Sequence, residues 1–198
     1  MVVISGPSGV GKDMLLRRIS KMGYSHHLVV TITTRQMRNG ERDGVDYHFL
    51  SEAEFRQMER RGELLESAQV YGNWYGVPRP QIEQALNQGK DVLLKVDIQG
   101  ADTIKHQFPQ AVLVFLAPSS LKELRQRLAR RQTESGANLE LRLQTAEKEM
   151  ESWSFFDYIV VNAEGKLDSA VSEINAIITA ERCRVCQTEE WQLKNITN

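Results

Sequence analysis

The 198-residue sequence lacks the features by which membrane and secreted proteins are recognised. It contains no run of about 18 apolar residues, the length at which a membrane-spanning helix becomes a candidate. No charged stretch followed by an apolar leader precedes the first apolar residues at positions 2–4. These absences predict a cytoplasmic protein that does not bind membranes.

The sequence also lacks an excess of charge of either sign. It has 25 Lys and Arg residues against 26 Asp and Glu residues, which gives a formal net charge of −1. Proteins that coat nucleic acids need a basic surface, because phosphate contacts supply much of their affinity. The balanced composition therefore argues against nucleic acid as a partner.

Cysteine is scarce, with only Cys183 and Cys186 near the end of the chain. A structural zinc site needs four ligands, and a redox C-x-x-C motif is expected beside a βαβ pattern, whereas this pair lies in a stretch that reads as a helix. We interpret both as ordinary helix residues, and a metal site shared across a dimer is the alternative. Whether the protein is a monomer or a homodimer stays open.

Short apolar runs alternate with helical patterns along most of the chain. The apolar runs lie at 2–4, 28–32, 92–96, 112–116 and 158–161. Four of them are continuous rather than alternating, which is typical of parallel strands covered on both faces. Helical patterns lie at 12–22, 98–108, 121–131, 139–153 and 167–188. This order predicts an α/β fold in which helices cover both faces of a central parallel sheet.

Residues 33–90 do not follow this alternation. Positions 38–44 read RNGERDG, a polar and turn-rich stretch, and Val45, Tyr47 and Phe49 then alternate with polar neighbours. We interpret the stretch as a small mixed or antiparallel insertion that holds a second substrate. A second irregular piece at 132–138 joins two arginine-bearing helices, and we expect it to act as a mobile lid.

A glycine-rich motif connects the first predicted strand and helix. Residues 6–13 read GPSGVGKD, in the strand, turn and helix context of a phosphate-binding loop. Glycines let successive backbone N–H groups surround phosphate oxygens at a helix N-terminus, and Lys12 adds a charge for the outer phosphates. Asp13 departs from the pattern, because a Ser or Thr that meets the nucleotide's Mg²⁺ is expected there. A glycine-containing turn in some other α/β protein is the alternative.

Several further motifs resemble those of the guanylate kinase family. They read TTRQMRNGERDGVDYHF at 33–49, GELLE at 62–66, YGNWYG at 71–76 and VDIQG at 96–100. Together with the phosphate loop they follow the order of the family as far as Asn162, which covers most of the chain. The resemblance implies a P-loop three-layer α/β/α fold that uses ATP, GMP and Mg²⁺. It implies a core of residues 1–32, 90–130 and 154–198, a GMP-binding subdomain at 33–89 and a helical lid at 131–142.

The resemblance also implies a role for individual residues. The expected ATP-binding residues are Gly6, Pro7, Ser8, Gly9, Val10, Gly11, Lys12, Asp13 and Asn162. The expected GMP-binding residues are Thr31, Arg35, Arg38, Tyr47, Glu66, Tyr75 and Asp97. The expected catalytic residues are Lys12, Arg38, Arg127, Arg131 and Arg142, and Asp13 is the candidate metal ligand. The chemistry agrees, since guanidinium and phenol groups suit a phosphate and a carboxylate can accept both donors of the guanine edge.

Three positions depart from the family pattern. Asp13 replaces the hydroxyl residue after the loop lysine, Lys95 replaces the first aspartate of the motif before Gly100, and Val77 replaces a hydroxyl residue that would face guanine O6. We interpret Asp13 and Lys95 as a reciprocal change in which the lysine cancels the repulsion between the carboxylate and the nucleotide phosphates. Direct binding of Mg²⁺ by Asp13, and mere tolerance of both residues, are the alternatives. We expect Val77 to weaken base recognition by about 1 kcal/mol.

The leading hypothesis is an enzyme that transfers the ATP γ-phosphoryl group to GMP, and to dGMP, in nucleotide metabolism. Two alternatives remain open from the sequence. One is a guanylate-kinase-like binding module with impaired catalysis, which Asp13 and Lys95 make worth testing. The other is a related kinase of sugar phosphates, against which the carboxylates of Glu66 and Asp97 argue.

Overall fold

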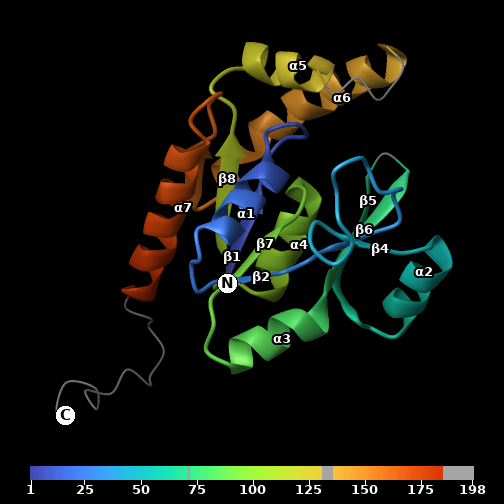
Figure 1. The fold of residues 1–198 in the computed structure, drawn as a ribbon, viewed down its shortest axis with the longest axis vertical. Coiled ribbons are helices and arrows are strands. Elements are labelled where there is room, and N and C mark those ends of the chain that lie inside the picture. Colours follow the sequence, from blue (N-terminus) through green and yellow to red (C-terminus); the bar gives the residue numbers. More distant parts are fainter. Residues whose placement is uncertain (71, 131–135, 185–198) are drawn as a thin grey trace.

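A five-stranded parallel sheet forms the centre of the molecule in the computed structural model, which describes residues 1–70, 72–130 and 136–184 (Figure 1). All neighbouring strands of this sheet pair in parallel. The order across the sheet is β2 (His27–Leu28), β7 (Val92–Lys95), β1 (Val2–Ser5), β8 (Val112–Ala117) and β9 (Tyr158–Val161). The predicted parallel sheet is therefore confirmed.

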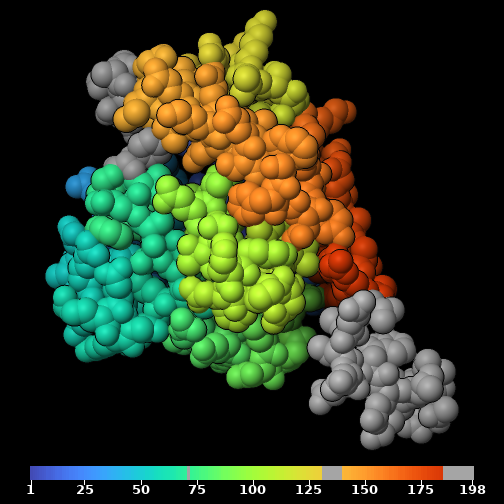
Figure 2. All heavy atoms as spheres, turned by 180° about the vertical axis from the view of Figure 1, so that it is seen from behind, coloured from blue at the N-terminus to red at the C-terminus, as the bar shows by residue number. Residues whose placement is uncertain are grey.

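Helices cover both faces of this sheet. On one face α1 (Lys12–Lys21) and α7 (Leu167–Arg182) pack against Ile4 and Val114, and on the other α3 (Arg79–Asn87) and α4 (Ile98–Gln107) pack against Val3 and Leu113. Successive strand residues thus enter opposite cores, which explains why the apolar runs are continuous. Figure 2 shows α3 and α4, in green, covering the back of the molecule below α6 in orange.

The sequence suggested a single strand at residues 28–32, and this prediction is wrong. It divides between β2 of the central sheet and β3 (Ile32–Thr33) of a second sheet. The backbone N–H of Val30 donates to the side chain of Gln81 at 3.2 Å, so a side chain takes the place of a strand partner at the crossing. The apolar residues of this run indicate that the segment is buried. They do not indicate that it passes from one sheet to the other, because that change depends on residues about fifty positions away.

The second sheet is mixed, as predicted for the insertion. Its order is β4 (His48–Phe49), β3, β6 (Asn73–Pro78) and β5 (Leu64–Val70); β3 and β4 pair in parallel and the other pairs are antiparallel. Helix α2 (Glu52–Arg60) packs its buried Phe55 near Ile32 and Leu64. Helices α2 and α3 were not predicted from the sequence, although the capping box of Ser51 and Glu54 that begins α2 is a readable signal.

Of the three remaining helices, the first two pack against each other through apolar side chains. The three are α5 (Leu121–Arg130), α6 (Gly136–Glu151) and the short 3₁₀ helix η1 (Ser152–Phe155). Helix α6 begins three residues before the predicted start, and of the predicted lid segment 132–138 the part before 136 lies outside the described residues. Cys183 is exposed and caps the end of α7 at Arg182, while Cys186 is outside the described ranges. No helix of the described part is both long and apolar enough to cross a membrane.

Candidate active site

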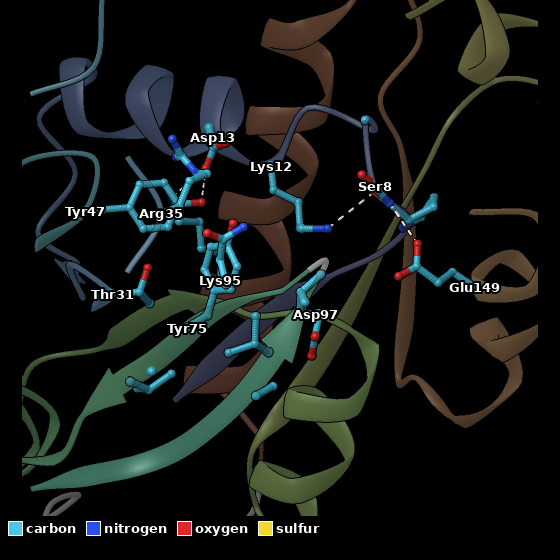
Figure 3. Close-up of a pocket in the computed structure, with 18 of the residues that line it drawn as sticks. Ser8, Lys12, Asp13, Thr31, Arg35, Tyr47, Tyr75, Lys95, Asp97 and Glu149 are labelled. Carbon is cyan, nitrogen blue, oxygen red and sulfur yellow. Dashed lines mark hydrogen bonds and ion pairs between the residues drawn. The ribbon is translucent and has the colours of Figure 1, made fainter. Parts of the chain in front are cut away.

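A cavity of about 720 Å³ lies where the phosphate loop, the end of β7, the second sheet and α6 meet. Figure 3 shows side chains from these elements pointing toward one another. The predicted site residues that line the cavity are Pro7, Ser8, Gly9, Gly11, Lys12, Asp13, Thr31, Arg35, Arg38, Tyr47, Glu66, Tyr75, Asp97 and Arg142. Residues that are up to 135 positions apart in the sequence therefore share one cavity.

The phosphate loop depends on glycine at its ends. Gly6 has φ 141°, and a Cβ there would lie 2.2 Å from the backbone oxygen of Leu116 in β8. Gly11 has φ 102° immediately before α1, and a Cβ there would lie 2.7 Å from Nδ2 of Asn162. Any larger residue would push the loop away from the sheet. The loop can therefore present its amide groups at the N-terminus of α1, where anions bind.

The ammonium group of Lys12 folds back onto this loop. Its Nζ donates to the backbone oxygens of Gly6 and, at 3.3 Å, Pro7. Burial lowers the pKa of Lys12, while the nearby carboxylates of Glu149 and Asp13 oppose that shift. A bound phosphate would give this buried cation a stronger partner than two carbonyl oxygens.

Glu149 of α6 contacts the phosphate loop and was not predicted from the sequence. Its Oε2 accepts a hydrogen bond of 2.9 Å from the backbone N–H of Ser8 (Figure 3). Burial raises the pKa of Glu149, and the Ser8 amide and Lys12 oppose that shift. Glu149 follows Arg142 by seven positions, so helical periodicity places both on one face of α6 and was the available signal. Arg142 itself lies 3.4 Å from Ser8 Oγ.

Asp13 and Lys95 form an ion pair at the phosphate-loop end of the cavity, as the sequence suggested. The pair arises because β7 lies beside β1, with Lys95 aligned with Ile4 just before the loop. Burial alone would raise the pKa of the Asp13 carboxyl, but Lys95, Lys12 and the Tyr47 hydroxyl together outweigh burial and lower it to about 2. Asp13 is therefore ionised and matched by a cation in the protein.

The predicted acceptor-phosphate residues gather on the second sheet and its loops. Tyr47 and Tyr75 have ring centroids 6.1 Å apart, and the guanidinium of Arg35 lies 5.3 Å from the Tyr47 ring. Glu41, which was not predicted from the sequence, accepts two hydrogen bonds of 2.9 Å from Arg35 and one of 2.7 Å from the backbone N–H of Arg38. Glu41 therefore holds the segment of both arginines in shape.

Two carboxylates lie close together in the cavity, Glu66 of the second sheet and Asp97, which follows β7 and also lies near Lys12 of the phosphate loop. Glu66 of β5 is 7 % exposed, and burial, together with the charge of Asp97, raises its pKa to about 8. Asp97 caps α4 by accepting a 2.7 Å hydrogen bond from the backbone N–H of Gly100. A Cβ at Gly100 would lie 3.0 Å from the Glu66 carboxylate, so this glycine makes room for it. Val77 of β6 is buried beside them and also lines the cavity.

Arg127 and Asn162 lie behind the phosphate loop rather than in the cavity lining. Arg127 donates to the backbone oxygens of Val10 at 2.9 Å and Asn162 at 2.7 Å, and it also pairs with Glu123. Asn162 Nδ2 donates to the same Val10 oxygen at 2.8 Å. In this structure both residues support the loop from outside. Arg131 lies outside the described residues.

Comparison with known proteins decides the family. The guanylate kinase family model matches residues 1–181. The chain belongs to the guanylate kinase family. A protein named guanylate kinase from Desulfitobacterium hafniense (strain Y51) is 47 % identical over 189 residues, which are 93 % of this chain and 92 % of the relative. A second one, from Caldanaerobacter subterraneus subsp. tengcongensis, is 41 % identical over 194 residues, 98 % of this chain and 93 % of the relative.

A solved structure of the guanylate kinase family gives the same answer for the fold. The crystal structure of guanylate kinase from Anaplasma phagocytophilum aligns with a TM-score of 0.81 at 30 % identity, covering 99 % of this chain and 92 % of the other. The P-loop kinase fold and the family suggested by the sequence motifs are thus confirmed.

Proposed function

We propose that the protein transfers the γ-phosphoryl group of ATP to GMP, giving ADP and GDP, and that dGMP is a second acceptor. One observation carries this proposal. The phosphate loop, a cluster of phosphate-binding side chains and a pair of buried carboxylates all line one cavity. Two nucleotides can lie end to end only if these three groups share a single space.

The carboxylate end is proposed as the guanine slot. Guanine offers N1–H and an amino group side by side, and the two oxygens of Glu66 can accept both donors together. Asp97 lies beside Glu66 and adds an acceptor. Adenine has an unprotonated N1 that would leave the buried carboxylate without a donor, which is the kind of mismatch that discriminates strongly.

The acceptor phosphate is proposed to bind between the second sheet and the phosphate loop, through Thr31, Arg35, Arg38, Tyr47 and Tyr75. Phosphoryl transfer is catalysed mainly by positioning and by neutralising the charge of the transferring group. We assign this role to Lys12, Arg38 and Arg142 directly. Arg127 and Arg131 complete the predicted cationic set, with residues 131–142 as the lid over the core and over the 33–89 subdomain.

ATP is proposed to bind on the phosphate loop at residues 6–13, with Asn162 at its edge. Mg²⁺ arrives with the nucleotide. Within the described residues no three His, Cys, Asp or Glu side chains cluster as a metal site, so the phosphates and water would supply most ligands. Asp13 fits as one protein ligand, because Lys95 and Tyr47 both donate hydrogen bonds to its Oδ1 and its side chain is 36 % exposed. When bound, Mg²⁺ would neutralise phosphate charge.

No residue needs to act as a general base, because the attacking oxygen belongs to a phosphate that is already ionised. The protein's part is to hold the acceptor phosphate in line with the ATP γ-phosphate and to exclude water. Lys95 offsets the charge of Asp13 at this point, so the unusual carboxylate does not leave a net negative charge against the phosphates.

A coupled assay with GMP, dGMP, IMP, AMP and ribose phosphates tests the proposal. We expect turnover with GMP and dGMP that requires ATP and Mg²⁺. Turnover of AMP or of a ribose phosphate with none of GMP would overturn the assignment. Calorimetric titration with ATP, with and without Mg²⁺, separates an enzyme from a non-catalytic binding module.

A further inference from the structure

The ammonium group of Lys95 is surrounded by three groups of the protein. Its Nζ donates to Asp13 Oδ1 and, at 3.2 Å, to the backbone oxygen of Asp46, and it lies 3.7 Å from the centroid of the Tyr47 ring. An ammonium group has three hydrogens, and these contacts account for all of them. Lys95, which is only 8 % exposed, is therefore arranged to hold protein groups rather than a phosphate oxygen.

The segment that Lys95 contacts is also fastened to α1. Asp46 accepts hydrogen bonds from the side chain of Arg17 and, at 2.8 Å, from the backbone N–H of Arg42. Arg17 follows Asp13 by four positions, so both project from one face of α1. Residues 40–47 are thus tied to two elements, α1 and β7, that carry the phosphate-loop side of the cavity.

We propose that Lys95 is a positioning residue for the acceptor site. It holds the ring of Tyr47 and the adjoining backbone against the phosphate-loop end of the cavity, and Asp13 acts as the counter-ion that keeps Lys95 in place. The inference rests on the proposed function, because it assigns the Tyr47 hydroxyl to the acceptor phosphate. Asp13 and Lys95, the two departures from the family pattern, thus share one role.

The hydroxyl of Tyr47 has one hydrogen, so it cannot serve Asp13 and a phosphate at once. In this structure it donates to Asp13 Oδ1 at 3.1 Å (Figure 3). When a phosphate binds, the O–H turns toward it by rotation about the C–O bond. The ring does not need to move, because Lys95 still holds it.

The test replaces the charged pair by a neutral pair of similar shape, Lys95→Met with Asp13→Asn. The net charge beside the phosphates is unchanged, and the amide oxygen can still accept from Tyr47. We expect the Kd for GMP to rise about tenfold, the effect of losing roughly one buried polar contact. The Kd for ATP, measured without Mg²⁺ because Asp13 is also a proposed metal ligand, should rise by a clearly smaller factor than the Kd for GMP.

A second arm asks whether the effect passes through Tyr47. In a Tyr47→Leu background the same pair of substitutions should raise the Kd for GMP less than about twofold further, because the ring that Lys95 holds is gone. Lys95→Arg keeps a cation beside the ring and should retain GMP affinity within about threefold. The matched control, Arg18→Gln with Asp168→Asn, removes an exposed ion pair between α1 and α7 and should change neither Kd.

The outcomes separate the two proposals. If the unaltered protein neither binds nor phosphorylates GMP, the proposed function fails and the positioning role fails with it. If the unaltered protein phosphorylates GMP but the neutral pair binds it normally, only the positioning role fails. The positioning role also fails if the effects of the neutral pair and Tyr47→Leu multiply, or if ATP binding weakens as much as GMP binding. Melting temperatures confirm that each variant is folded.

Discussion

The two ends of the cavity differ in how their charges are balanced. At the phosphate-loop end the charges have partners within the protein: Asp13 pairs with Lys95, and Lys12 bonds to carbonyl oxygens of the loop. At the opposite end burial and the charge of Asp97 raise the pKa of Glu66, and within the described residues no basic group opposes that shift. One end is organised before a ligand arrives, whereas the other relies on the ligand to supply hydrogen-bond donors.

This difference indicates how selectivity is divided. A phosphate is common to all nucleotides, so the balanced end can bind tightly but cannot choose between bases. A buried carboxylate without a hydrogen-bond donor raises the free energy of a complex, so the other end should bind tightly only a ligand with donors in the right place. Substitutions at the two ends should therefore change different quantities.

The largest effect is expected from Lys12→Met at the phosphate-loop end. The change removes the cation that we propose meets the transferring phosphoryl group, and the loss of one such preorganised group should lower turnover by about a thousandfold. GMP binding, measured by calorimetry, should change little, because the guanine slot is untouched. Lys90→Met, an exposed lysine before β7, is the matched control and should retain full activity. Normal turnover by Lys12→Met would remove the phosphate loop from the mechanism.

The next largest effect is expected from Glu66→Gln at the guanine slot. An amide can accept only one of the two guanine donors and turns its own N–H₂ toward the other, so kcat/KM for GMP should fall about a hundredfold. ATP affinity should stay the same. Glu63→Gln, a surface change in the same segment, is the control and should leave kcat/KM unaltered. Equal losses for GMP and ATP affinity would contradict a base-reading role.

The pH dependence of GMP binding should follow the unusual pKa of Glu66. In the ligand-free protein the Glu66 carboxyl has a pKa of about 8, yet only the ionised carboxylate can accept hydrogen bonds from both guanine donors. GMP affinity should therefore increase between pH 6 and pH 8, by several tens of fold if Glu66 alone controls it. Binding at pH 7 should release about one proton, which calorimetry in buffers of different ionisation enthalpy measures. In Glu66→Gln only the titration of the GMP phosphate should remain.

The same pKa has a consequence for stability with a definite sign. Because the folded-state pKa of Glu66 is raised, the folded protein binds more protons than the unfolded chain between about pH 4.5 and pH 8. This group therefore lowers the free energy of unfolding as the pH rises through that window. Glu66→Gln should flatten this part of the stability curve, and an unchanged curve would mean that Glu66 is ionised in the free protein.

The sequence predicted some parts of the site and the fold but not others. The phosphate loop is a continuous motif, and the pairing of Asp13 with Lys95 followed from the expectation that the strand ending at Lys95 runs beside the phosphate loop. The partners Glu41 and Asp46 were not predicted, because a surface carboxylate in a polar turn looks the same whether or not it binds an arginine. The split of residues 28–32 between two sheets was missed for a similar reason, since it depends on Gln81 far along the chain.

The smallest effect is expected from Val77→Thr, which restores a hydroxyl to the guanine slot. Val77 is 1 % exposed, lines the cavity and is paired with Glu66 across β5 and β6. One added hydrogen bond to guanine O6 contributes about 1 kcal/mol, so the Kd for GMP should fall about fivefold. The free protein should melt at a slightly lower temperature, because the buried hydroxyl has no guanine partner there. Val29→Thr, in a buried segment away from the cavity, is the control for that cost.

The pairing of Val77 with Glu66 allows a second result that can be told apart from the first. If the new hydroxyl donated to Glu66 instead of to guanine, it would stabilise the ionised carboxylate and lower the pKa of Glu66. The pH profile of GMP binding would then move to lower pH, with little gain in affinity at high pH. We expect the profile to keep its midpoint and the affinity to increase at every pH, because a donor aimed at O6 acts only when guanine is present. A shifted midpoint would show that a side chain of the protein can stabilise the ionised Glu66 carboxylate, as Lys95 does for Asp13 at the phosphate-loop end.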